Sequence, residues 1–365
     1  MKYLFILGRN PELSIAELKA VFEFKEFSKK GNSILVELDK LEKGIIEKLG
    51  GVIAIGEVFS EGVLGLDDKI LSFETKNKLN YVIWNFSDSV NKFKIYLKKR
   101  FKSEKLKATE KNLNGILRLQ NEKEIKISKG LIDEEFFVFD NYFGKIIETC
   151  DYNSLENRDM KKPVRREELS ISPRLAKIMI NLSQIKKGGK LLDGFCGIGV
   201  ILQEALLQKI KVVGIDVDIN AIKGARKNLE WFEFSKKDYK LINSDLKKVD
   251  VGKVDVMVSE PDLGKILKRM PTEKEASDIL NGFENLMIGV LKNINTLKGT
   301  RKNISGKIVF SAPLIKVVKG RKGCNWEKIS KMVGLKIVEG FPIQEFRKDK
   351  IVGREIFVFE DTQKL

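Results

Sequence analysis

The chain has 365 residues, of which 42% are hydrophobic, and its 68 Lys and Arg outnumber its 51 Asp and Glu to give a formal net charge of +17. This length and composition are typical of a globular protein with two or three domains. The sequence contains no histidine, which excludes a histidine triad, a histidine general base and the usual zinc sites. The charge surplus favours a polyanionic partner, although a lysine-rich solvated surface would give the same count.

Cysteine usage and hydropathy indicate the compartment. The three cysteines, Cys150, Cys196 and Cys324, lie far apart without metal-ligand spacing, so they are expected to be thiols in a reducing environment. No apolar run is long enough to span a membrane, and the first residues lack a signal-peptide pattern. We therefore expect a cytoplasmic protein with no membrane partner and no metal.

Residues 1–60 are predicted to form a small ferredoxin-like α+β domain. Ser14 and Glu17 have the spacing of a capping box at the start of a helix. The expected order is strand, helix, strand, helix, strand. The strands are predicted at 3–8, 33–38 and 52–59, with the second helix at 41–49.

Residues 61–150 are predicted to form a second α+β unit that binds RNA. Its helix at 90–101 places Phe93, Tyr96 and Phe101 at helical spacing toward a core, so its many basic residues would face solvent or phosphates. A purely solvated helix face would read the same way. Strands are expected at 81–86, 116–119, 124–128, 135–139 and 143–149. The candidate RNA-binding residues of this helix are Lys98, Lys99, Arg100 and Lys102.

Residues 151–172 are polar, basic and interrupted by proline, which predicts a linker. We take Arg158, Lys162 and Arg165 in this segment as further candidate RNA contacts.

The stretch from Lys190 to Asp218 predicts half of a doubly wound nucleotide-binding unit. A buried strand is followed by a turn with Gly194, Gly197 and Gly199, then by an apolar helix and a second strand that ends at Asp216. Glycines let the backbone approach a ligand, and an acid after the second strand can accept hydrogen bonds from ribose hydroxyls. The turn is therefore expected to hold a nucleoside, although a similar turn can also occur in an α/β protein that binds nothing there.

The acid before the first glycine distinguishes between cofactors. A carboxylate at Asp193 would repel a pyrophosphate, whereas it suits the ammonium of an amino-acid tail. This favours S-adenosylmethionine over NAD.

The rest of the C-terminal half, residues 173–365, is predicted to complete a Rossmann-like α/β sheet. Asp245 follows the third strand, where it could accept from an adenine amine, although a turn or cap role is an equal alternative. A fourth strand at 254–258 ends at Ser259, where a second substrate should meet the cofactor. The closing strands at 335–339 and 355–359 have no helix between them, which implies an antiparallel pair of the kind found in methyltransferases. Helices are expected at 173–183, 220–232, 273–297 and 326–333, and the remaining strands at 240–242 and 307–310.

Several motifs resemble those of a known family. Leu49–Val58 is similar to the end of the ferredoxin-like domain in THUMP-domain RNA methyltransferases, Asn157–Arg165 resembles their RD..RP.R linker motif, and Ser172–Ala176 resembles their HPALA box. This family modifies the exocyclic amine of a guanine in tRNA, the position-10 type. The resemblance implies that residues from about 62 to 149 form a THUMP domain.

The resemblance also assigns site residues. The candidate cofactor-binding residues are Asp193, Phe195, Cys196, Gly197, Gly199, Asp216 and Asp245. The family's D-P-P-Y catalytic box is replaced here by Ser259, Glu260, Pro261 and Asp262. In the family, the first residue and a backbone carbonyl align the target amine while the aromatic residue stacks on the extruded base. Ser259 brings no charge and Asp262 cannot stack, so another aromatic could take that place, or Glu260 or Asp262 could bind the amine.

The sequence therefore predicts an S-adenosylmethionine-dependent methyltransferase acting on the N2 amine of a tRNA guanine, with tRNA or another structured RNA as partner. Two rivals stay open. One is an RNA-binding protein of the same fold with lost or altered chemistry, as the atypical box suggests. The other is a methyltransferase for a small molecule or protein, for which a basic N-terminal half would have no purpose.

Overall fold

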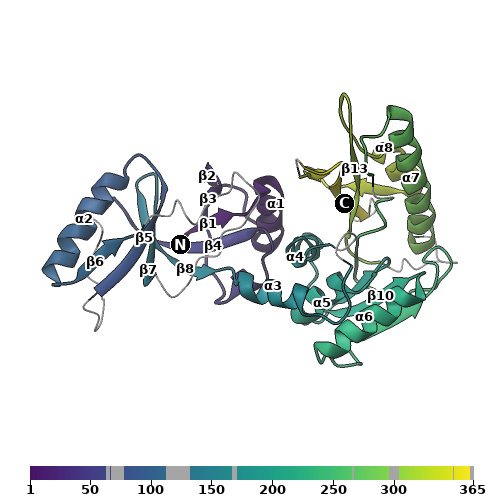
Figure 1. Ribbon diagram of the computed structural model, residues 1–365, viewed down its shortest axis with the longest axis horizontal. Coiled ribbons are helices and arrows are strands. Elements are labelled where there is room, and N and C mark those ends of the chain that lie inside the picture. Colours follow the sequence, from purple (N-terminus) through teal and green to yellow (C-terminus); the bar gives the residue numbers. More distant parts are fainter. Residues whose placement is uncertain are drawn as a thin grey trace. The chain divides into compact units, whose positions relative to one another are not determined.

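The computed structural model describes residues 1–62, 66, 78–111, 132–166, 171–264, 267–295, 304–347 and 349–361. The strands expected at 116–119 and 124–128 lie outside these ranges. The described chain divides into two compact units (Figure 1). The first unit contains Met1–Ile15, Phe22–Glu47 and Gly51–Tyr152, and the second contains Ala16–Val21, Lys48–Gly50 and Asn153–Leu365.

The strands up to residue 149 form one eight-stranded sheet in the order β2-β3-β1-β4-β8-β7-β5-β6. The sheet therefore runs through both segments predicted as separate domains, and the boundary at residue 60 and the THUMP assignment stay predictions. The elements are β1 (Lys2–Leu7), α1 (Pro11–Phe22), β2 (Ser28–Lys30), β3 (Ser33–Glu37), β4 (Val52–Glu61), β5 (Lys78–Phe86), α2 (Val90–Ser103), β6 (Lys107–Glu110), β7 (Glu134–Phe139) and β8 (Tyr142–Thr149).

The helix expected at 41–49 is wrong. A single 3-10 turn, η1 (Ile45–Glu47), occupies this segment. Gly44 directly before it has a left-handed φ of 80°, which interrupts a helix. The Glu148 carboxylate accepts the backbone N–H groups of Gly44 and Ile46, at 2.5 and 3.0 Å, and so caps the short turn.

Helix α2 has the orientation that the sequence predicts. Phe93, Leu97 and Phe101 are buried, and Tyr96 packs against the same core from a partly buried position. The opposite face is exposed and carries Lys98, Lys99 and Lys102. This side of the helix is therefore available to solvent or to a polyanion.

The second unit contains a mixed sheet with the path β11-β10-β9-β12-β13-β17-β15. Its neighbours from β11 to β13 are parallel, and β17 pairs antiparallel with both β13 and β15, as expected for the closing strands. The elements are α3 (Tyr152–Met160), α4 (Pro173–Leu182), β9 (Lys190–Asp193), α5 (Val200–Leu207), β10 (Lys211–Asp216), α6 (Ile219–Trp231), β11 (Tyr239–Asn243), β12 (Val256–Ser259), α7 (Glu273–Asn295), β13 (Ile308–Val317), β14 (Gly320–Lys322), α8 (Trp326–Val333), β15 (Leu335–Ile337), β16 (Ile343–Glu345) and β17 (Val352–Asp361).

Helices cover both faces of this sheet. The core beneath α7 and α8 joins Met287 and Trp326 to strand residues such as Val213 and Phe357. Side chains alternate along a strand, so Gly214 points to the other face, where a Cβ would lie 2.6 Å from Leu202 of α5. The second unit is thus a Rossmann-like α/β sandwich. Chain order reverses between β9 and β12, and in such folds ligands bind beyond the carboxyl ends of the strands at this reversal.

Candidate functional site

The turn from β9 to α5 has the backbone that a close-lying ligand requires. Gly197 and Gly199 adopt left-handed φ values of 51° and 88°, and Gly199 caps the N-terminus of α5. A Cβ at Gly194 would lie 2.1 Å from the Leu246 side chain, whereas nothing lies within 4 Å of the Cβ position at Gly197. Gly194 therefore lets the turn pack closely against Leu246, and there is open space beside Gly197.

Asp193 ends β9 with only 1% of its surface exposed. Its Oδ1 accepts hydrogen bonds from the Ser259 hydroxyl at 2.8 Å and from the Phe195 N–H at 3.3 Å. Burial raises the pKa of Asp193 to about 7, the two hydrogen bonds oppose that rise, and the nearby charges of Asp216 and Glu260 add to it. Ionising a buried carboxyl without a cation beside it costs free energy, and a bound cation would stabilise the ionised form.

Asp216 ends β10 and fixes the same turn from the other side. Its Oδ2 accepts the Gly197 N–H at 2.8 Å and its Oδ1 accepts the Asp218 N–H at 2.9 Å. Asn243 donates to the carbonyls of Asp216 and Val217 at 2.9 and 2.8 Å. The carboxylate is partly exposed and its oxygens keep lone pairs for ribose hydroxyls.

Val217 is a candidate that the sequence reasoning missed. Its side chain is 70% exposed directly after Asp216, although it is apolar. An exposed aliphatic side chain beside a predicted ribose acid offers contact area to a nucleobase. An apolar residue immediately after the strand-ending acid was the available sequence signal.

The remaining candidate cofactor residues have more local contacts. Phe195 is partly buried against the core below α7. Burial, followed by the charges of Asp193 and Asp216, raises the pKa of Cys196 well above its usual value, so this thiol stays protonated.

Asp245 accepts the Lys247 N–H at 2.9 Å and its other oxygen lies 3.7 Å from Lys247 Nζ. Asp245 therefore stabilises its own turn, while its partly exposed carboxylate faces solvent on one side.

Ser259, the last residue of β12, is fully buried and points inward. Its hydroxyl donates to Asp193 and accepts the Gly194 N–H at 2.7 Å. Both bonds tie the end of β12 to the glycine turn. The Ser259 hydroxyl is thus occupied by the turn rather than presented to a substrate.

Glu260 is the first carboxylate beyond the end of β12. Its Oε1 accepts from Arg354 Nε of β17 at 2.5 Å and from the Ser311 hydroxyl of β13 at 3.3 Å. The Glu260 side chain is 9% exposed and that of Arg354 is 24% exposed. Burial opposes the protonated form of Arg354, but the charge and hydrogen bond of Glu260 outweigh it and raise the pKa of the guanidinium. Arg354 and Ser311 were missed because they lie 94 and 51 residues away in sequence.

Pro261 is buried after Glu260, and Asp262 is exposed. The Asp262 Oδ1 accepts the Gly264 N–H at 3.0 Å, an Asx-type contact that shapes its own loop. The structure therefore brings Asp193, Ser259 and Glu260 together at the carboxyl edge of the sheet, with Asp262 at the exposed rim of the loop.

The candidate RNA-binding residues differ in their exposure. Arg100 of α2 forms an i,i+4 ion pair with Glu104 at 2.6 Å, beside the exposed lysines of that helix. In the predicted linker, Arg158 lies 3.3 Å from Glu204 of α5, and Lys162 is 2.7 Å from Asp159 with only 2% of its side chain exposed. Arg165 is exposed. Contact of these residues with RNA stays a prediction, and the linker itself contains helix α3.

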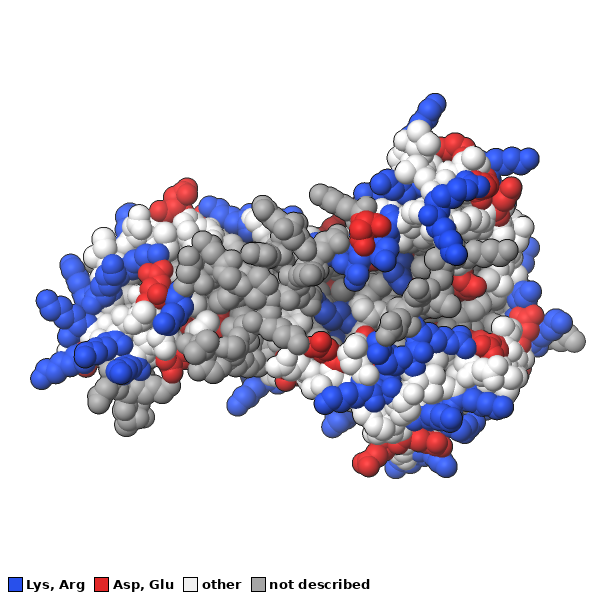
Figure 2. Space-filling view, in the orientation of Figure 1, with Lys and Arg blue, Asp and Glu red and all other residues white. Residues whose placement is uncertain are grey.

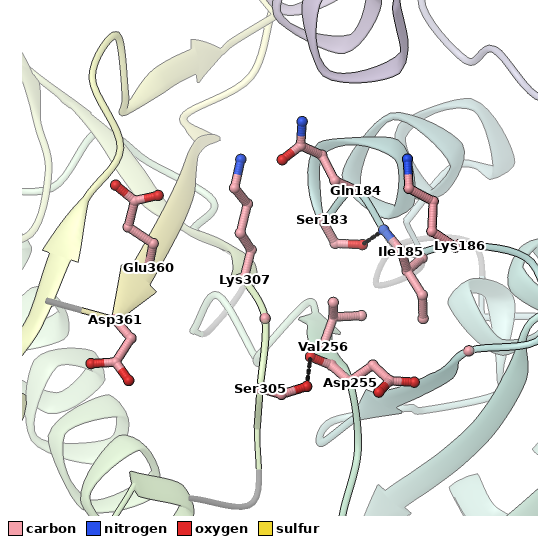
Figure 3. Close-up of a pocket in the computed structure, with 12 residues that line it drawn as sticks. Ser183, Gln184, Ile185, Lys186, Asp255, Val256, Ser305, Lys307, Glu360 and Asp361 are labelled. Atoms are coloured by element: carbon pink, nitrogen blue, oxygen red, sulfur yellow. Dashed lines mark hydrogen bonds between the residues drawn. The ribbon is translucent and has the colours of Figure 1, made fainter. Parts of the chain in front are cut away.

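A separate cavity of about 570 Å³ lies at the opposite edge of the sheet. Lys307 precedes β13, Asp255 precedes β12, and Glu360 lies at the end of β17, so the cavity sits where the parallel strands begin (Figure 3). Its charges are mixed, with Lys186 and Lys307 opposed to acidic side chains. None of the predicted site residues lines it.

None of the helices in the described ranges is both long and apolar enough to cross a membrane. Within the same ranges, no group of three or more Cys, Asp or Glu side chains could hold a metal ion. Location in the cytoplasm stays a prediction.

Comparison with known proteins identifies similar chains. Residues 163–297 match a family model described as UPF0020, RMKL-like, methyltransferase domain. A tRNA (guanine(10)-N2)-dimethyltransferase of Methanothermobacter thermautotrophicus is 28% identical over 275 residues, which are 72% of this chain and 78% of the relative. The protein of the same name from Methanocaldococcus jannaschii is 25% identical over 301 residues, 72% of this chain and 85% of the relative. The crystal structure of TrmN from Thermus thermophilus matches with a TM-score of 0.50 and 14% identity over 99% of this chain and 100% of that chain, which shows a shared fold.

Proposed function

Because residues 163–297 make this chain a member of the UPF0020 methyltransferase family, we propose that it transfers a methyl group from S-adenosylmethionine to the exocyclic N2 amine of a guanine in tRNA. The observation that carries the proposal is the meeting of Asp193, the glycine turn and Glu260 at one edge of the sheet. The named activity of the two archaeal relatives supports the choice of substrate.

The residues of the turn fit S-adenosylmethionine. Asp193 is a buried carboxyl whose described contacts include no cation, and the ammonium of the cofactor's amino-acid part would favour its ionised form. Asp216 would accept from the ribose hydroxyls, while Val217 and Asp245 would flank the adenine. The open space beside Gly197 leaves room for the ligand. When bound, the cofactor supplies an electrophilic methyl group, so the protein needs no metal for this chemistry.

The chain's own contribution to catalysis is orientation of the target amine. Glu260 is held by Arg354 and Ser311, which keeps a carboxylate oxygen fixed beside the glycine turn. We assign Glu260 as the acceptor for an N–H of the amine, so that the nitrogen lone pair turns toward the methyl donor. Pro261 follows it in the loop, and the carbonyls there are the second class of acceptor. Ser259 acts indirectly because its hydroxyl holds Asp193 and Gly194.

The carboxylate of Glu260 also supplies the charge that Ser259, the first residue of the atypical box, lacks. The exocyclic amine of guanine is a weak nucleophile, and an ionised acceptor favours the rehybridised nitrogen more than a neutral hydroxyl does. After methyl transfer the nitrogen must lose a proton, and Glu260, which accepts the N–H of the amine in this assignment, would take it. No aromatic residue at position 262 is needed for that step.

The proposal is tested by incubating the full chain with labelled S-adenosylmethionine and unmodified total tRNA, followed by digestion and mass spectrometry of the labelled nucleoside. Label in N2-methylguanosine or its dimethyl form is the expected result. A chain that binds both cofactor and tRNA but transfers no label would favour the RNA-binding rival. Label in a protein or small molecule would favour the other.

The role of Glu260 is tested in the same assay with Glu260→Gln, which keeps the size and hydrogen-bonding capacity of the side chain but removes its negative charge. It should bind the cofactor like the unmodified chain and lose most of its turnover. Equal turnover in both chains would remove Glu260 from the proposed chemistry.

A further inference from the structure

The segment 161–166, which we call the strap, is fixed to helix α6 of the second unit. The Val164 N–H donates to Asn228 Oδ1 at 2.9 Å, and the Asn228 amide donates to the carbonyls of Val164 and Ile198, each at 3.0 Å. Asn228 is fully buried. Gly224 lets Val164 approach, because a Cβ there would lie 3.1 Å from the Val164 side chain. The strap therefore has a defined position on α6 and shares an anchor with the glycine turn.

Basic side chains gather on the solvent side of this assembly. Helix α6 exposes Lys223, Arg226 and Lys227, whose i, i+3 and i+4 spacing places them on one side of the helix. The strap adds the exposed Lys161. The surface view shows lysine and arginine side chains over α6 (Figure 2). We call the set Lys161, Lys223, Arg226 and Lys227 the α6 basic face.

The strap and α6 together contain one acidic residue, Glu230. Asp218 pairs with Arg166 of the strap at 2.8 Å, and Glu230 lies 4.0 Å from Lys236. The four cations of the α6 basic face therefore outnumber the one acidic residue of these two segments. Like charges held on a rigid surface repel one another, which favours binding of an external polyanion.

The position of the α6 basic face relates it to the candidate site. Helix α6 begins after Asp218, two residues beyond Asp216, whose carboxylate accepts the Gly197 N–H. Lys223 and Lys227 lie about 8 and 14 Å along the helix axis from Asp218. A polymer with regularly spaced phosphates could contact these lysines while one of its nucleotides reaches the carboxyl edge of the sheet.

We propose that the α6 basic face binds phosphates of the RNA substrate and positions the target nucleotide at the methyltransferase site. The proposal rests on the proposed function and adds a second RNA contact, distinct from the lysines of α2. An RNA backbone suits the surface better than an acidic peptide, because structured RNA presents rigid, closely spaced phosphates that a fixed row of cations can match. Recognition here would be by charge and shape and would carry no base sequence.

The test compares Lys223→Gln/Lys227→Gln with the unmodified full chain in equilibrium binding of unmodified tRNA at several salt concentrations. We expect tRNA affinity to fall about tenfold near 0.15 M salt, and the salt slope to fall by about 2, one for each lost phosphate contact. The matched control is Lys331→Gln/Lys336→Gln, which removes two exposed lysines from α8 and β15 and should change affinity less than twofold. Lys223→Arg/Lys227→Arg keeps both charges and should bind nearly as well as the unmodified chain.

S-adenosylmethionine binding and the thermal unfolding midpoint are measured for every variant, so a folding defect is recognised separately. Equal tRNA affinity and salt slope in the glutamine variant and the unmodified chain would overturn the proposal. Because binding is read without methyl transfer, the two hypotheses fail separately. If the glutamine variant loses tRNA affinity but the unmodified chain does not methylate tRNA, the α6 basic face stands as an RNA-binding surface and the proposed function is rejected.

Discussion

The Ser259 hydroxyl donates a hydrogen bond to Asp193 Oδ1 over 2.8 Å and accepts the Gly194 N–H over 2.7 Å. One buried side chain therefore links the end of β12 to both the acid and the first glycine of the cofactor turn. This makes Ser259 a positioning residue, and it leaves Glu260 as the group that faces the substrate in the proposed chemistry.

Cofactor affinity should depend on pH through Asp193. Burial raises the pKa of Asp193 to about 7, so the carboxylate that would pair with the cofactor's ammonium is mostly protonated at pH 6. S-adenosylmethionine affinity should rise about eightfold between pH 6 and 7.5, following the ionised fraction of a group with this pKa. Calorimetric titration at several pH values checks this. Asp193→Asn should bind weakly and show a flat profile over the same range, and a slope as steep as that of the unmodified chain would contradict the assignment.

The stability of the unliganded chain should also depend on the ionisation of Asp193, but it should fall as the pH rises, whereas cofactor affinity rises. The folded-state pKa of Asp193 lies above the ordinary value of 3.8, so its stabilising contribution is complete below pH 4 and is lost as the pH rises through 7. Asp193→Asn has no carboxyl that titrates at this position. The difference in free energy of unfolding between the variant and the unmodified chain should therefore shift by a few kcal/mol in favour of the variant from pH 4 to 8. Denaturant unfolding at both pH values measures the shift.

Ser259→Ala should disturb both groups that the hydroxyl serves. Loss of the hydrogen bond to Asp193 raises the pKa of that carboxyl further, so the midpoint of the binding profile moves to higher pH. The Gly194 N–H loses its acceptor in a buried site, which should cost about 1–3 kcal/mol of stability. Ser311→Ala is the matched control, because Ser311 is equally buried but bonds to Glu260. An unchanged midpoint in Ser259→Ala would separate Ser259 from the titration of Asp193.

Arg354 should act on turnover through Glu260. Arg354→Gln removes the guanidinium that fixes and charge-balances Glu260, so kcat should fall more than tenfold while the Kd for S-adenosylmethionine stays within about twofold. Arg354→Lys keeps the charge but not the planar donor, and should recover part of the loss. The exposed Arg321, which bonds to Gln344, offers a control in Arg321→Gln. A purely structural role would instead lower stability and leave the kcat of the folded fraction unchanged.

The position of the strap on α6 should depend on Asn228. Asn228→Ala removes three hydrogen bonds from a fully buried position and should lower the free energy of unfolding by about 2–4 kcal/mol. It should also speed tryptic cleavage after Lys161 and Arg165, since the strap loses its anchor. Lys227→Ala, one residue away and exposed, should change stability by less than about 0.5 kcal/mol. Equal cleavage rates in the two variants would show that the strap is held by other contacts.

Local pattern predicted much of the second unit. The glycine turn, Asp193 and Asp216 could be placed because a strand, a turn and a helix follow one another within a short stretch. Helix α8 and the antiparallel β15 and β17 were predicted because apolar periodicity and the missing crossover helix are local signals.

Contacts between distant segments could not be predicted in this way. All four residues of β12 are buried, so alternation gave no sign that Ser259 points toward Asp193. The pairing of Glu260 with Arg354 depends on where β17 enters the sheet, which no local spacing encodes. Helix α3 was missed because its polar composition reads as a linker, and it is anchored through Arg158 to Glu204 of α5.

Asp262 stands where the resemblance leads one to expect an aromatic residue. Its carboxylate is exposed and bonds to the Gly264 N–H, so it shapes the loop rather than the methyl-acceptor site. Asp262→Asn keeps that acceptor and should leave kcat within about threefold, because one solvent-exposed hydrogen bond contributes little. Asp262→Tyr places a ring at the rim of the site, where it can stack on an extruded base, and should preserve or raise kcat on tRNA. Single-turnover assays on unmodified tRNA measure both variants. A severe loss of turnover in Asp262→Asn, with cofactor affinity intact, would instead place the Asp262 charge in contact with the substrate.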